Sequence, residues 1–345
     1  MAADDRDEGQ REGLRQLALG FIPAQLVHVA ARLGVADALA DGPREVPALA
    51  AAMDADPDSL ARLLRALRVI GIVTEPEPRV VALTDLGQPL RADHPASLRS
   101  MILLYGDEAT WRAWGALTHS VRTGETAFDH VHDEPAFDHF ARHPALSRTF
   151  NDAMVEGTRR IAPAVAEVHE FSRHRVVMDV GGGRGTLLAA ILQATPTLRG
   201  VLFDTPEGAA SAADLLTDAG VAERCRIETG DFFERVPDGA DCHVLKSVIH
   251  DWDDQRSTTI LDNCRWALPD DGRLLLVEPV LPERVEEPEA AGIVMSDINM
   301  LVNTGGRERT EEEFASLLRG AGLELVGVSP PLPGSQLRVL EAAVV

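Results

Sequence analysis

The sequence has no apolar run long enough to cross a lipid bilayer, and its first residues, MAADDRDEGQREG, are charged. A spanning helix needs about 20 mostly apolar residues, and a secretory signal needs an apolar core. We therefore expect a cytoplasmic protein that has no membrane partner.

Cysteine and lysine are both scarce. The three cysteines, Cys225, Cys242 and Cys264, have no spacing typical of metal ligands, so we expect reduced, buried thiols. Lys246 is the only lysine, and it lies four residues before His250. The other basic residues are arginines, which we attribute to GC-rich coding, so the single lysine is of interest without being decisive.

Basic charge is also in deficit, because the net charge is −22 at pH 7. Nucleic-acid binding requires basic surface, so we expect no nucleic-acid partner. The alternative is a DNA-binding regulator, since two helices followed by a hairpin over residues 46–83 have the outline of a winged helix. The second helix, PDSLARLLRALRVIG, carries a wide apolar stripe, which favours a packing or dimerisation module.

The apolar pattern divides the chain into a helical part and an α/β part. Residues 14–40 predict a helix that Pro23 kinks or breaks, and residues 97–170 are helical in pattern. From about residue 172, short Val/Ile/Leu runs alternate with helical segments, which is typical of a parallel sheet covered on both faces. The last residues, 323–345, predict a hairpin added to that sheet.

The stretch VVMDVGGGRGTLLAAIL reads as a strand, a glycine turn and a helix. Such glycines allow a sharp turn and the close approach of a ligand. The dinucleotide fingerprint G-x-G-x-x-G/A fits Gly181 and Gly183, but its third position is Thr186. Asp179, inside the turn, would repel a pyrophosphate but not a positively charged cofactor.

Acidic residues also follow the next two strands. Asp204 ends VLFD, where it suits the two hydroxyls of a ribose. Asp231 follows the third strand beside Phe232 and Phe233, so an acid and an aromatic ring could hold an adenine. Because ligands bind at the carboxyl ends of parallel strands, these tips together predict an S-adenosylmethionine site.

At this point the chain resembles a known family, the S-adenosylmethionine-dependent O-methyltransferases of the plant caffeate and isoflavonoid type. A bacterial branch of the family modifies anthracyclines and other aromatic natural products. The resemblance covers almost the whole chain and rests on DVGGGRG, FDTPEG, GDFF, LKSVIHDWDD, LLLVEPVLP and NMLVNTGGRERTEEEF. It implies a doubly wound, Rossmann-like α/β sheet at 172–345, a winged-helix-like dimerisation domain at 1–110, and a helical connector at 111–171 that contributes to the substrate pocket.

The resemblance also assigns roles to individual residues. It implies that Trp252 packs near the adenosine, that His250 is the general base, and that further cofactor contacts come from Gly181, Gly183, Asp204, Asp231, Phe232 and Lys246. It implies Glu278 and Glu308 as the acids that flank the histidine. It implies substrate contacts from Phe150, Asn151, Met154 and Asp297. One departure is SMILLYG, which is apolar where the plant enzymes place a polar substrate contact.

The chemistry agrees with these roles. A phenol titrates near ~10, whereas a histidine near ~6.5 can take its proton at neutral pH. Glu278, after the fifth strand, can hold the imidazole in one tautomer. No metal is required, and the histidines of HVH and HFARH (130–143) lack convincing metal partners.

We therefore expect a homodimeric enzyme that methylates a hydroxyl, most simply a phenol, of an aromatic small molecule of secondary metabolism. An amine or carboxylate acceptor stays open. A second alternative is a protein that binds S-adenosylmethionine but catalyses hydroxylation, decarboxylation or a pericyclic step.

Overall fold

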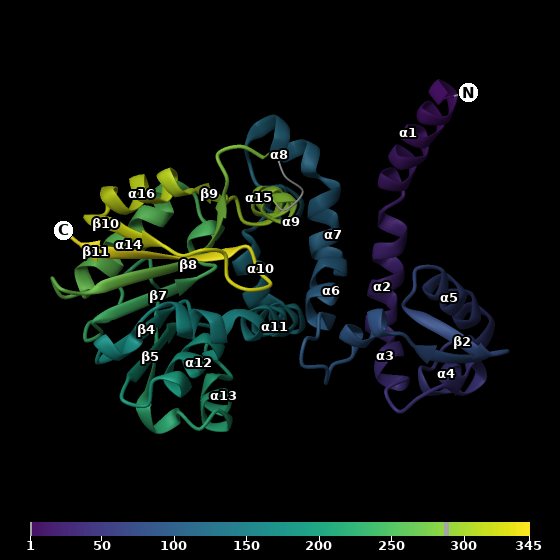
Figure 1. The fold of residues 1–345 in the computed structure, drawn as a ribbon, viewed down its shortest axis with the longest axis horizontal. Helices are drawn as coiled ribbons and strands as arrows, with labels where there is room; N and C mark the ends of the chain where they lie inside the picture. The colour runs from purple at the N-terminus through teal and green to yellow at the C-terminus, as the bar shows by residue number, and fades with distance from the viewer. Residues whose placement is uncertain (1, 286–289) are drawn as a thin grey trace. The chain divides into compact units, whose positions relative to one another are not determined.

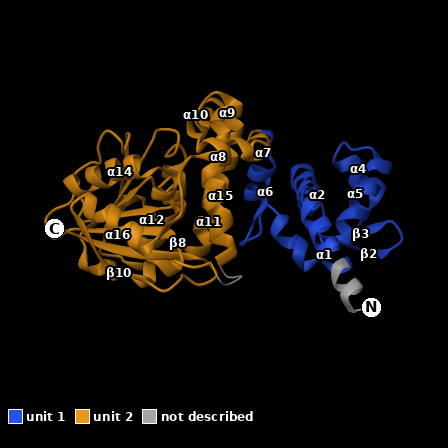
Figure 2. Ribbon diagram, turned by 90° about the horizontal axis from the view of Figure 1, so that it is seen from above, with its two compact units in different colours: residues 1–108 blue, residues 109–345 orange. Residues whose placement is uncertain are grey.

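The computed structural model describes residues 2–285 and 290–345. The chain divides between Glu108 and Ala109 into two compact units (Figure 2). Residues 111–171, expected as a connector, therefore pack with the second unit. The elements of the first unit are α1 (Ala2–Ala18), α2 (Phe21–Leu33), α3 (Val35–Ala38), β1 (Arg44–Glu45), α4 (Val46–Ala52), α5 (Pro57–Val69), β2 (Val73–Glu77), β3 (Val80–Leu83), η1 (Asp85–Leu90) and α6 (Arg99–Gly106).

The first unit has the helix and hairpin outline expected from the sequence. The side chain of Asp56 accepts a hydrogen bond from the N–H of Ser59 at 2.8 Å, which caps the start of α5. Helix α5 buries Leu60, Leu64 and Leu67, which lie on one face at helical spacing. Strands β2 and β3 form an antiparallel hairpin, and β1 adds to its other side.

The N-terminal helix differs from its prediction. The stretch 14–40 is not one helix kinked at Pro23, because α1 ends before Gly20 and α2 ends at Gly34. Gly34 has a φ of 71°, a left-handed conformation that ends a helix at little cost when the residue is glycine. Pro23 lies in the first turn of α2, where its missing N–H breaks no hydrogen bond of the helix.

The second unit is an α/β domain (Figure 1). Its helices are α7 (Glu108–Gly115), α8 (Leu117–Thr123), α9 (Ala127–His132), α10 (Ala136–Arg142), α11 (Pro144–Val168), η2 (Phe171–Arg173), α12 (Thr186–Ala194), α13 (Ala212–Asp218), η3 (Ala222–Arg224), η4 (Ile249–Asp251), α14 (Asp254–Ala267), α15 (Ala291–Asn303) and α16 (Glu311–Gly320). Its strands are β4 (Val176–Val180), β5 (Arg199–Asp204), β6 (Cys225–Thr229), β7 (Cys242–Lys246), β8 (Arg273–Leu281), β9 (Arg309–Thr310), β10 (Leu323–Val328) and β11 (Leu337–Val344).

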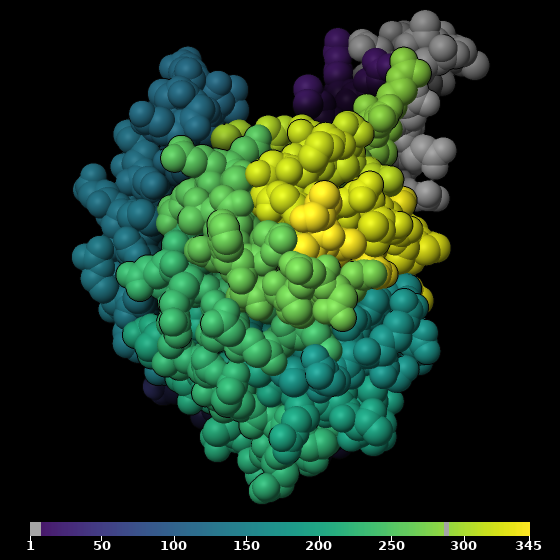
Figure 3. All heavy atoms as spheres, turned by 90° about the vertical axis from the view of Figure 1, so that its left-hand side faces the viewer, coloured from purple at the N-terminus to yellow at the C-terminus, as the bar shows by residue number. Residues whose placement is uncertain are grey.

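The main sheet has the strand order β10-β11-β8-β7-β4-β5-β6, and β9 pairs with β8. Strands β4 to β8 are parallel, whereas β10 and β11 form the antiparallel hairpin expected from the sequence. This hairpin ends the chain at the surface of the second unit, in yellow in Figure 3. From β4 the chain adds β5 and β6 on one side of the sheet and then β7 and β8 on the other, so the strand order reverses between β4 and β7. Open α/β sheets bind ligands at such a switch point.

The sheet is covered on both faces (Figure 1). Helices α14 and α16 pack on one face through residues such as Ile260 and Phe314. Helices α11, α12 and α13 pack on the other through residues such as Val165, Leu188 and Leu216. The near-continuous apolar runs of the strands follow from this arrangement, because alternate side chains enter opposite cores.

Within the described residues, no helix combines the length and the apolar character that a bilayer crossing requires. All three cysteines are free, with Cys242 and Cys264 buried and Cys225 partly exposed.

Candidate active site

The glycine turn follows β4 and leads into α12. Gly181, Gly183 and Gly185 all have positive φ, between 56° and 81°. A Cβ on Gly182 would lie 2.5 Å from a methyl carbon of Leu202, whereas a Cβ on Gly183 would meet nothing within 4 Å. The turn is therefore packed tightly against the sheet below and open on its other side, where a ligand can approach the backbone.

Two carboxyl groups lie beneath this turn. Asp204 accepts hydrogen bonds from the N–H of Gly183 at 2.7 Å and of Thr205 at 2.6 Å. Burial raises the pKa of Asp204, and these hydrogen bonds partly oppose the rise. Burial and the neighbouring Asp204 raise the pKa of Asp179 to about 7. One oxygen of Asp179 is buried without a hydrogen-bond partner among the described residues, so the pocket favours a ligand that carries positive charge and hydroxyl donors.

Aromatic rings line the neighbouring strand end. Asp231 follows β6, and its Oδ1 accepts a hydrogen bond from the N–H of Phe233. The Phe233 ring lies 4.8 Å from that of Trp252, centre to centre, and 4.9 Å from that of Phe232. The guanidinium of Arg256 lies 4.4 Å from the Phe233 ring and 4.2 Å from the Trp252 ring. The three aromatic rings form a wall suited to the flat face of a base, and the guanidinium of Arg256 stacks on two of them.

Lys246 ends β7, between the glycine turn and the histidine. Burial lowers the pKa of Lys246, while the carboxylates of Glu278, Asp179 and Asp251 oppose that effect. The next residue, Ser247, has a φ of 53°, which is uncommon for a residue other than glycine. This conformation turns the chain sharply from the strand into η4, which carries His250.

His250 faces two buried carboxylates. Its Nδ1 lies 3.0 Å from Oε1 of Glu308 and 3.8 Å from Oε2 of Glu278. The Nε2 atom lies 3.9 Å from Oδ1 of Asp251, which is too far for a hydrogen bond. The hydroxyl of Ser296 donates to the same oxygen of Glu308 at 2.6 Å. The imidazole is thus held through Nδ1, and no hydrogen bond to Asp251 holds its Nε2 atom.

Backbone N–H groups fix the carboxylate of Glu278, and a side-chain carboxylate fixes the backbone of Glu308. Oε1 of Glu278 accepts from the N–H of Val248 at 2.9 Å and of Ile249 at 2.8 Å. The N–H of Glu308 donates to Oδ1 of Asp297 at 2.9 Å. Strand β8 runs on past Glu278 to residue 281, so this acid lies within the strand and not at its end.

The charge state of His250 differs from that of a free imidazole. Burial opposes the charged form, but the carboxylates of Glu278, Glu308 and Asp251 outweigh burial and raise the pKa of His250 to about 10. Burial raises the pKa of Glu278 to about 7 and that of Asp251 to about 6. The pKa of His250 thus lies above the ordinary histidine value near ~6.5 that the sequence suggested, because two acids distant in the sequence converge on one ring nitrogen.

Arg309 holds the backbone that carries His250. Its side chain is almost fully buried and donates to the carbonyl oxygens of Ile249 at 3.1 Å and Trp252 at 2.8 Å. The same guanidinium pairs with Asp254 at 2.8 Å and lies 3.3 Å from the hydroxyl of Ser257. The sequence reasoning missed Arg309, because its contacts with Ile249 and Trp252 reach 57–60 residues back in the chain.

Aromatic residues of α10 and α11 adjoin the histidine segment. The Phe137 ring lies 5.3 Å from the Trp252 ring and 5.9 Å from the Phe150 ring, and Phe150 lies 5.0 Å from Phe140. Asn151 and Met154 follow on the same helix, and Met154 is 36% exposed. Phe150 therefore joins an aromatic wall that reaches Trp252, whose other side meets Phe233.

The structure brings most of the predicted residues to one edge of the sheet. The glycine turn, Asp204, Lys246 and His250 follow strands β4, β5 and β7 there. Asp297, expected to contact substrate, accepts a hydrogen bond from the N–H of Glu308 through its Oδ1. Residues that sequence reasoning missed include Arg256, Ser296 and Arg309, each of which acts through long-range contacts.

Comparison with known proteins identifies the family to which this chain is similar. An O-methyltransferase domain matches residues 114–324, and an O-methyltransferase dimerisation domain matches residues 15–92. The phenazine O-methyltransferase PhzM of Lysobacter antibioticus is 43% identical over 329 residues, which are 95% of each chain. The O-demethylpuromycin-O-methyltransferase of Streptomyces alboniger is 43% identical over 337 residues, which are 97% of this chain and 89% of that one. The crystal structure of LaPhzM superposes with a TM-score of 0.93, at 41% identity over 97% of this chain and 99% of that one.

Two further matches bear on cofactor and reaction. The O-methyltransferase NcsB1 from neocarzinostatin biosynthesis was crystallised with S-adenosylmethionine and 2-hydroxy-5-methyl naphthoic acid. It matches with a TM-score of 0.80 and 33% identity over 94% of this chain and 96% of that one. The aclacinomycin 10-hydroxylase RdmB of Streptomyces purpurascens is 36% identical over 312 residues, which are 88% of this chain and 82% of that one.

Proposed function

The chain belongs to the S-adenosylmethionine-dependent O-methyltransferase family, and we propose that it methylates a phenolic hydroxyl of an aromatic small molecule in antibiotic or related secondary metabolism. The observation that carries the proposal is the placement of His250. Its Nδ1 is held by Glu308 at 3.0 Å with Glu278 behind it, at the sheet edge where the glycine turn opens. This constellation has the parts of a general base beside a cofactor pocket.

The residues at the strand ends fit S-adenosylmethionine. Asp204 has its two backbone hydrogen bonds and keeps further lone pairs for the ribose hydroxyls. The open turn at Gly183 and the buried Oδ2 of Asp179, which has no hydrogen-bond partner among the described residues, suit the positively charged methionyl end. Phe232 and Trp252 would cover the adenine, with Asp231 near its amino group. Bound there, the cofactor supplies a methyl group on a sulfonium, whose leaving group is a neutral thioether that needs neither an acid nor a metal ion.

His250 accepts the proton of the acceptor hydroxyl. Its pKa of about 10, set by the surrounding carboxylates, keeps the imidazole protonated at neutral pH. Positive charge entering the pocket disfavours that proton, so His250 releases it more readily in the loaded site. The Nε2 atom then accepts the proton of the acceptor hydroxyl, and Glu308 stabilises the imidazolium through Nδ1. A general base of this kind contributes about 10²–10⁴-fold to the rate.

The aromatic wall indicates the kind of acceptor. Phe137 meets Phe150 edge to face and lies tilted against Trp252, two residues after His250 in the chain. Flat rings stack on such surfaces with offset or edge contacts. One relative is named for a phenazine, and the NcsB1 structure holds 2-hydroxy-5-methyl naphthoic acid, and both are aromatic compounds. We propose Phe150, Asn151 and Met154 as acceptor contacts, whereas Asp297 acts through Glu308.

The test of the proposal starts with calorimetry of S-adenosylmethionine and S-adenosylhomocysteine on the intact protein. We expect micromolar binding that Asp204→Ala weakens about 10²-fold or more, because two charge-assisted hydrogen bonds to the ribose are lost. Asp214→Ala is the matched control, since Asp214 is exposed on α13. Absence of binding by the folded wild type would refute the proposal.

Methyl transfer is then followed by mass spectrometry with a panel of phenols, aromatic amines and aromatic carboxylates. His250→Ala should keep cofactor binding and lose most of the transfer rate to a phenol. One S-adenosylhomocysteine must appear per methylated product. The hydroxylase, decarboxylase or pericyclic alternative instead predicts product formation with S-adenosylmethionine left unconsumed.

We propose that the protein forms a homodimer through the dimerisation domain at residues 15–92. Exposed apolar residues on the first two helices support this, among them Leu14, Leu17, Phe21 and Ile22. Light scattering after size exclusion tests the proposal, with Leu17→Arg expected to produce monomers. A cytoplasmic location and the lack of a nucleic-acid partner stay predictions from the charge and the N-terminal residues.

A further inference from the structure

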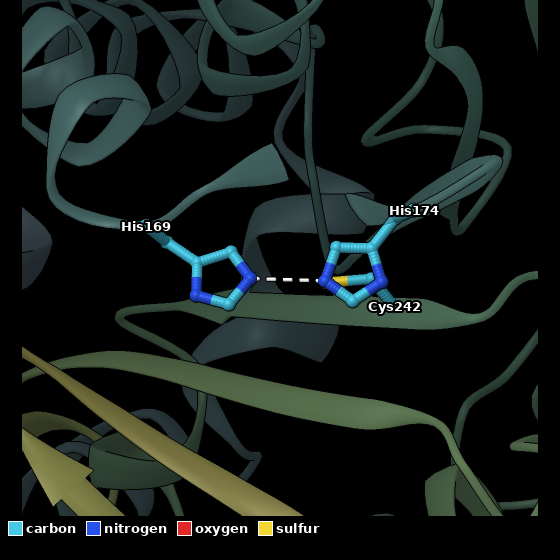
Figure 4. A group of neighbouring side chains, drawn as sticks. All are labelled: His169, His174 and Cys242. Carbon is cyan, nitrogen blue, oxygen red and sulfur yellow. Dashed lines mark hydrogen bonds between the residues drawn. The ribbon is translucent and has the colours of Figure 1, made fainter. Parts of the chain in front are cut away.

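Three potential metal ligands meet at the edge of the sheet opposite to His250. His169 follows the last residue of α11, His174 lies two residues before β4, and Cys242 is the first residue of β7. Each offers one donor atom, and these atoms all lie within 4.8 Å of one another. Figure 4 shows the two imidazole rings pointing toward each other with the sulfur beside them, and the two Nε2 atoms are 2.9 Å apart. Residues from three elements thus converge on one point.

The surrounding backbone holds these groups in place. Cys242 is fully buried and His169 is 6% exposed. Val177 is the register partner of Cys242 in the parallel pair of β4 and β7. The carboxylate of Asp241 accepts hydrogen bonds from the N–H groups of Arg175 and Val176 at 2.9–3.1 Å. These bonds fix the start of β4 against the start of β7, so the ligand positions are part of the fold.

The donor set fits Zn²⁺. Two imidazole nitrogens and a thiolate are ligands that zinc and similar borderline-soft ions prefer, and catalytic and structural zinc sites both use them. Bond lengths of about 2.0–2.3 Å place tetrahedral donors roughly 3.3–3.6 Å apart. The nitrogen pair at 2.9 Å must therefore open slightly, and the longest donor separation, at most 4.8 Å, must close by about 1 Å. Rotation of the side chains about their χ angles supplies such movements.

A carboxylate stands behind the first histidine. Nδ1 of His169 lies 3.4 Å from Oε2 of Glu341, on β11. A histidine that binds zinc through one nitrogen commonly donates its other N–H to a carboxylate, which orients the ring. Glu341 is itself held by Arg273, whose Nε lies 3.3 Å from its other oxygen.

The charges around the cluster are balanced, because Asp241 and Glu341 face it together with Arg173 and Arg273. Burial lowers the pKa of His169 and of His174, so both rings are neutral at neutral pH and keep a lone pair for a metal ion. Burial raises the pKa of the Cys242 thiol, so it is protonated without metal.

We propose that His169, His174 and Cys242 form a Zn²⁺ site that joins the end of α11 to the starts of β4 and β7, with water as the fourth ligand. On binding, the Cys242 thiol loses its proton to solvent and its sulfur bonds to the metal. Each imidazole binds the metal through Nε2 and carries its single ring proton on Nδ1. One proton is released per ion, so the affinity for metal rises with pH. This proposal is independent of the methyl-transfer chemistry.

The test uses the full-length protein stripped with a chelator and titrated with Co²⁺ as a spectroscopic probe. We expect one Co²⁺ per chain, a thiolate-to-cobalt charge-transfer band, and displacement of that band by Zn²⁺. Zn²⁺ at 100 times its Kd should raise the thermal midpoint by about 5 °C or more. Cys242→Ser should abolish the band, whereas Cys264→Ser, which changes a buried cysteine on α14, should keep it.

His174→Gln is a second variant, because His174 is only partly buried and its loss should leave the fold intact. It should weaken Co²⁺ binding at least 10-fold, with circular dichroism unchanged. Glu134, His139 and His143 form the other cluster of possible ligands, although Glu134 already pairs with His139 and Arg142. A wild type without a thiolate band, or cobalt binding that His143→Gln removes and Cys242→Ser leaves intact, would overturn the proposal.

Discussion

Replacing Glu308 with glutamine should lower the pKa of His250 and move the proton-transfer chemistry to lower pH. The change is nearly isosteric, and the amide oxygen can still accept from Ser296, which now donates at 2.6 Å. The negative charge 3.0 Å from Nδ1 is removed. Glu278, at 3.8 Å, then remains as the second acid.

The magnitude follows from the site. The pKa of His250 is about 10 against 6.5 for a free imidazole, and that gap corresponds to ~5 kcal/mol in favour of the imidazolium. An opposite charge at hydrogen-bond distance accounts for ~1–3 pKa units. Glu308→Gln should therefore bring the pKa of His250 down by ~1–3 units. Because the folded pKa lies above the unfolded one, His250 contributes stability at low pH that is lost as pH rises toward 10, and the variant should lose that contribution at a lower pH.

The assay is a pH titration of the imidazole resonances by NMR, with His250→Gln used to identify the signal of His250. This readout needs no acceptor molecule. Glu311→Gln is the control, since it removes the same charge from an exposed position on α16. With a phenolic acceptor, the rise of kcat/KM with pH should shift in the same direction. A pKa of His250 that stays within a few tenths of a unit of the wild-type value in Glu308→Gln would refute the account of where the proton resides.

Two further predictions concern stability. His243 is fully buried, burial lowers its pKa to about 3, and neither of its ring nitrogens has a hydrogen-bond partner among the described residues. Below about pH 6.5 the unfolded chain therefore binds a proton at His243 that the folded chain does not bind. The free energy of unfolding of His243→Leu, measured with urea relative to wild type, should rise by ~1.4 kcal/mol when the pH is lowered from 7.5 to 5.5. The same relative stability at both pH values would contradict this. Arg309→Met should lower the free energy of unfolding by ~3–5 kcal/mol, because the carbonyl oxygens of Ile249 and Trp252 lose their donor. The control Arg307→Met, at an exposed position, should change the free energy of unfolding by less than ~1 kcal/mol. Equal effects of the two substitutions in thermal unfolding would show that burial is not the cause.

The sequence predicted the main sheet well, because its signals are local. The run RVVMDV contains β4, LRGVLFD contains β5, and CHVLKSV contains β7. Each is apolar on both sides of the strand, which only a sheet covered on both faces explains. The start of the chain was predicted less well, because the helix pattern of 14–40 continues across Gly20 and Gly34 even though the backbone breaks there.

The candidate site shows the same division. The glycine turn, Asp204 and the position of His250 follow from the ends of parallel strands, which meet at one edge by construction. The pairing of His250 with Glu308 joins residues 58 apart in the chain and came from the family resemblance. Arg309, whose contacts reach 52–60 residues back, has no local pattern that distinguishes it from any other arginine. Long-range hydrogen bonds of single side chains are the part that periodicity cannot reveal.

The single lysine has a practical consequence. Lys246 is half-buried at the end of β7, and it is the only side-chain amine in the sequence. A reagent that acylates amines has one side-chain target, which lies at the proposed cofactor pocket, and the lowered pKa of Lys246 makes its free-amine form more abundant at moderate pH. The extent of acylation at Lys246, measured by peptide mass, should therefore report how much of the protein has cofactor bound in the proposed pocket. For the same reason, coupling to an amine-reactive support through a surface lysine is not available to this protein.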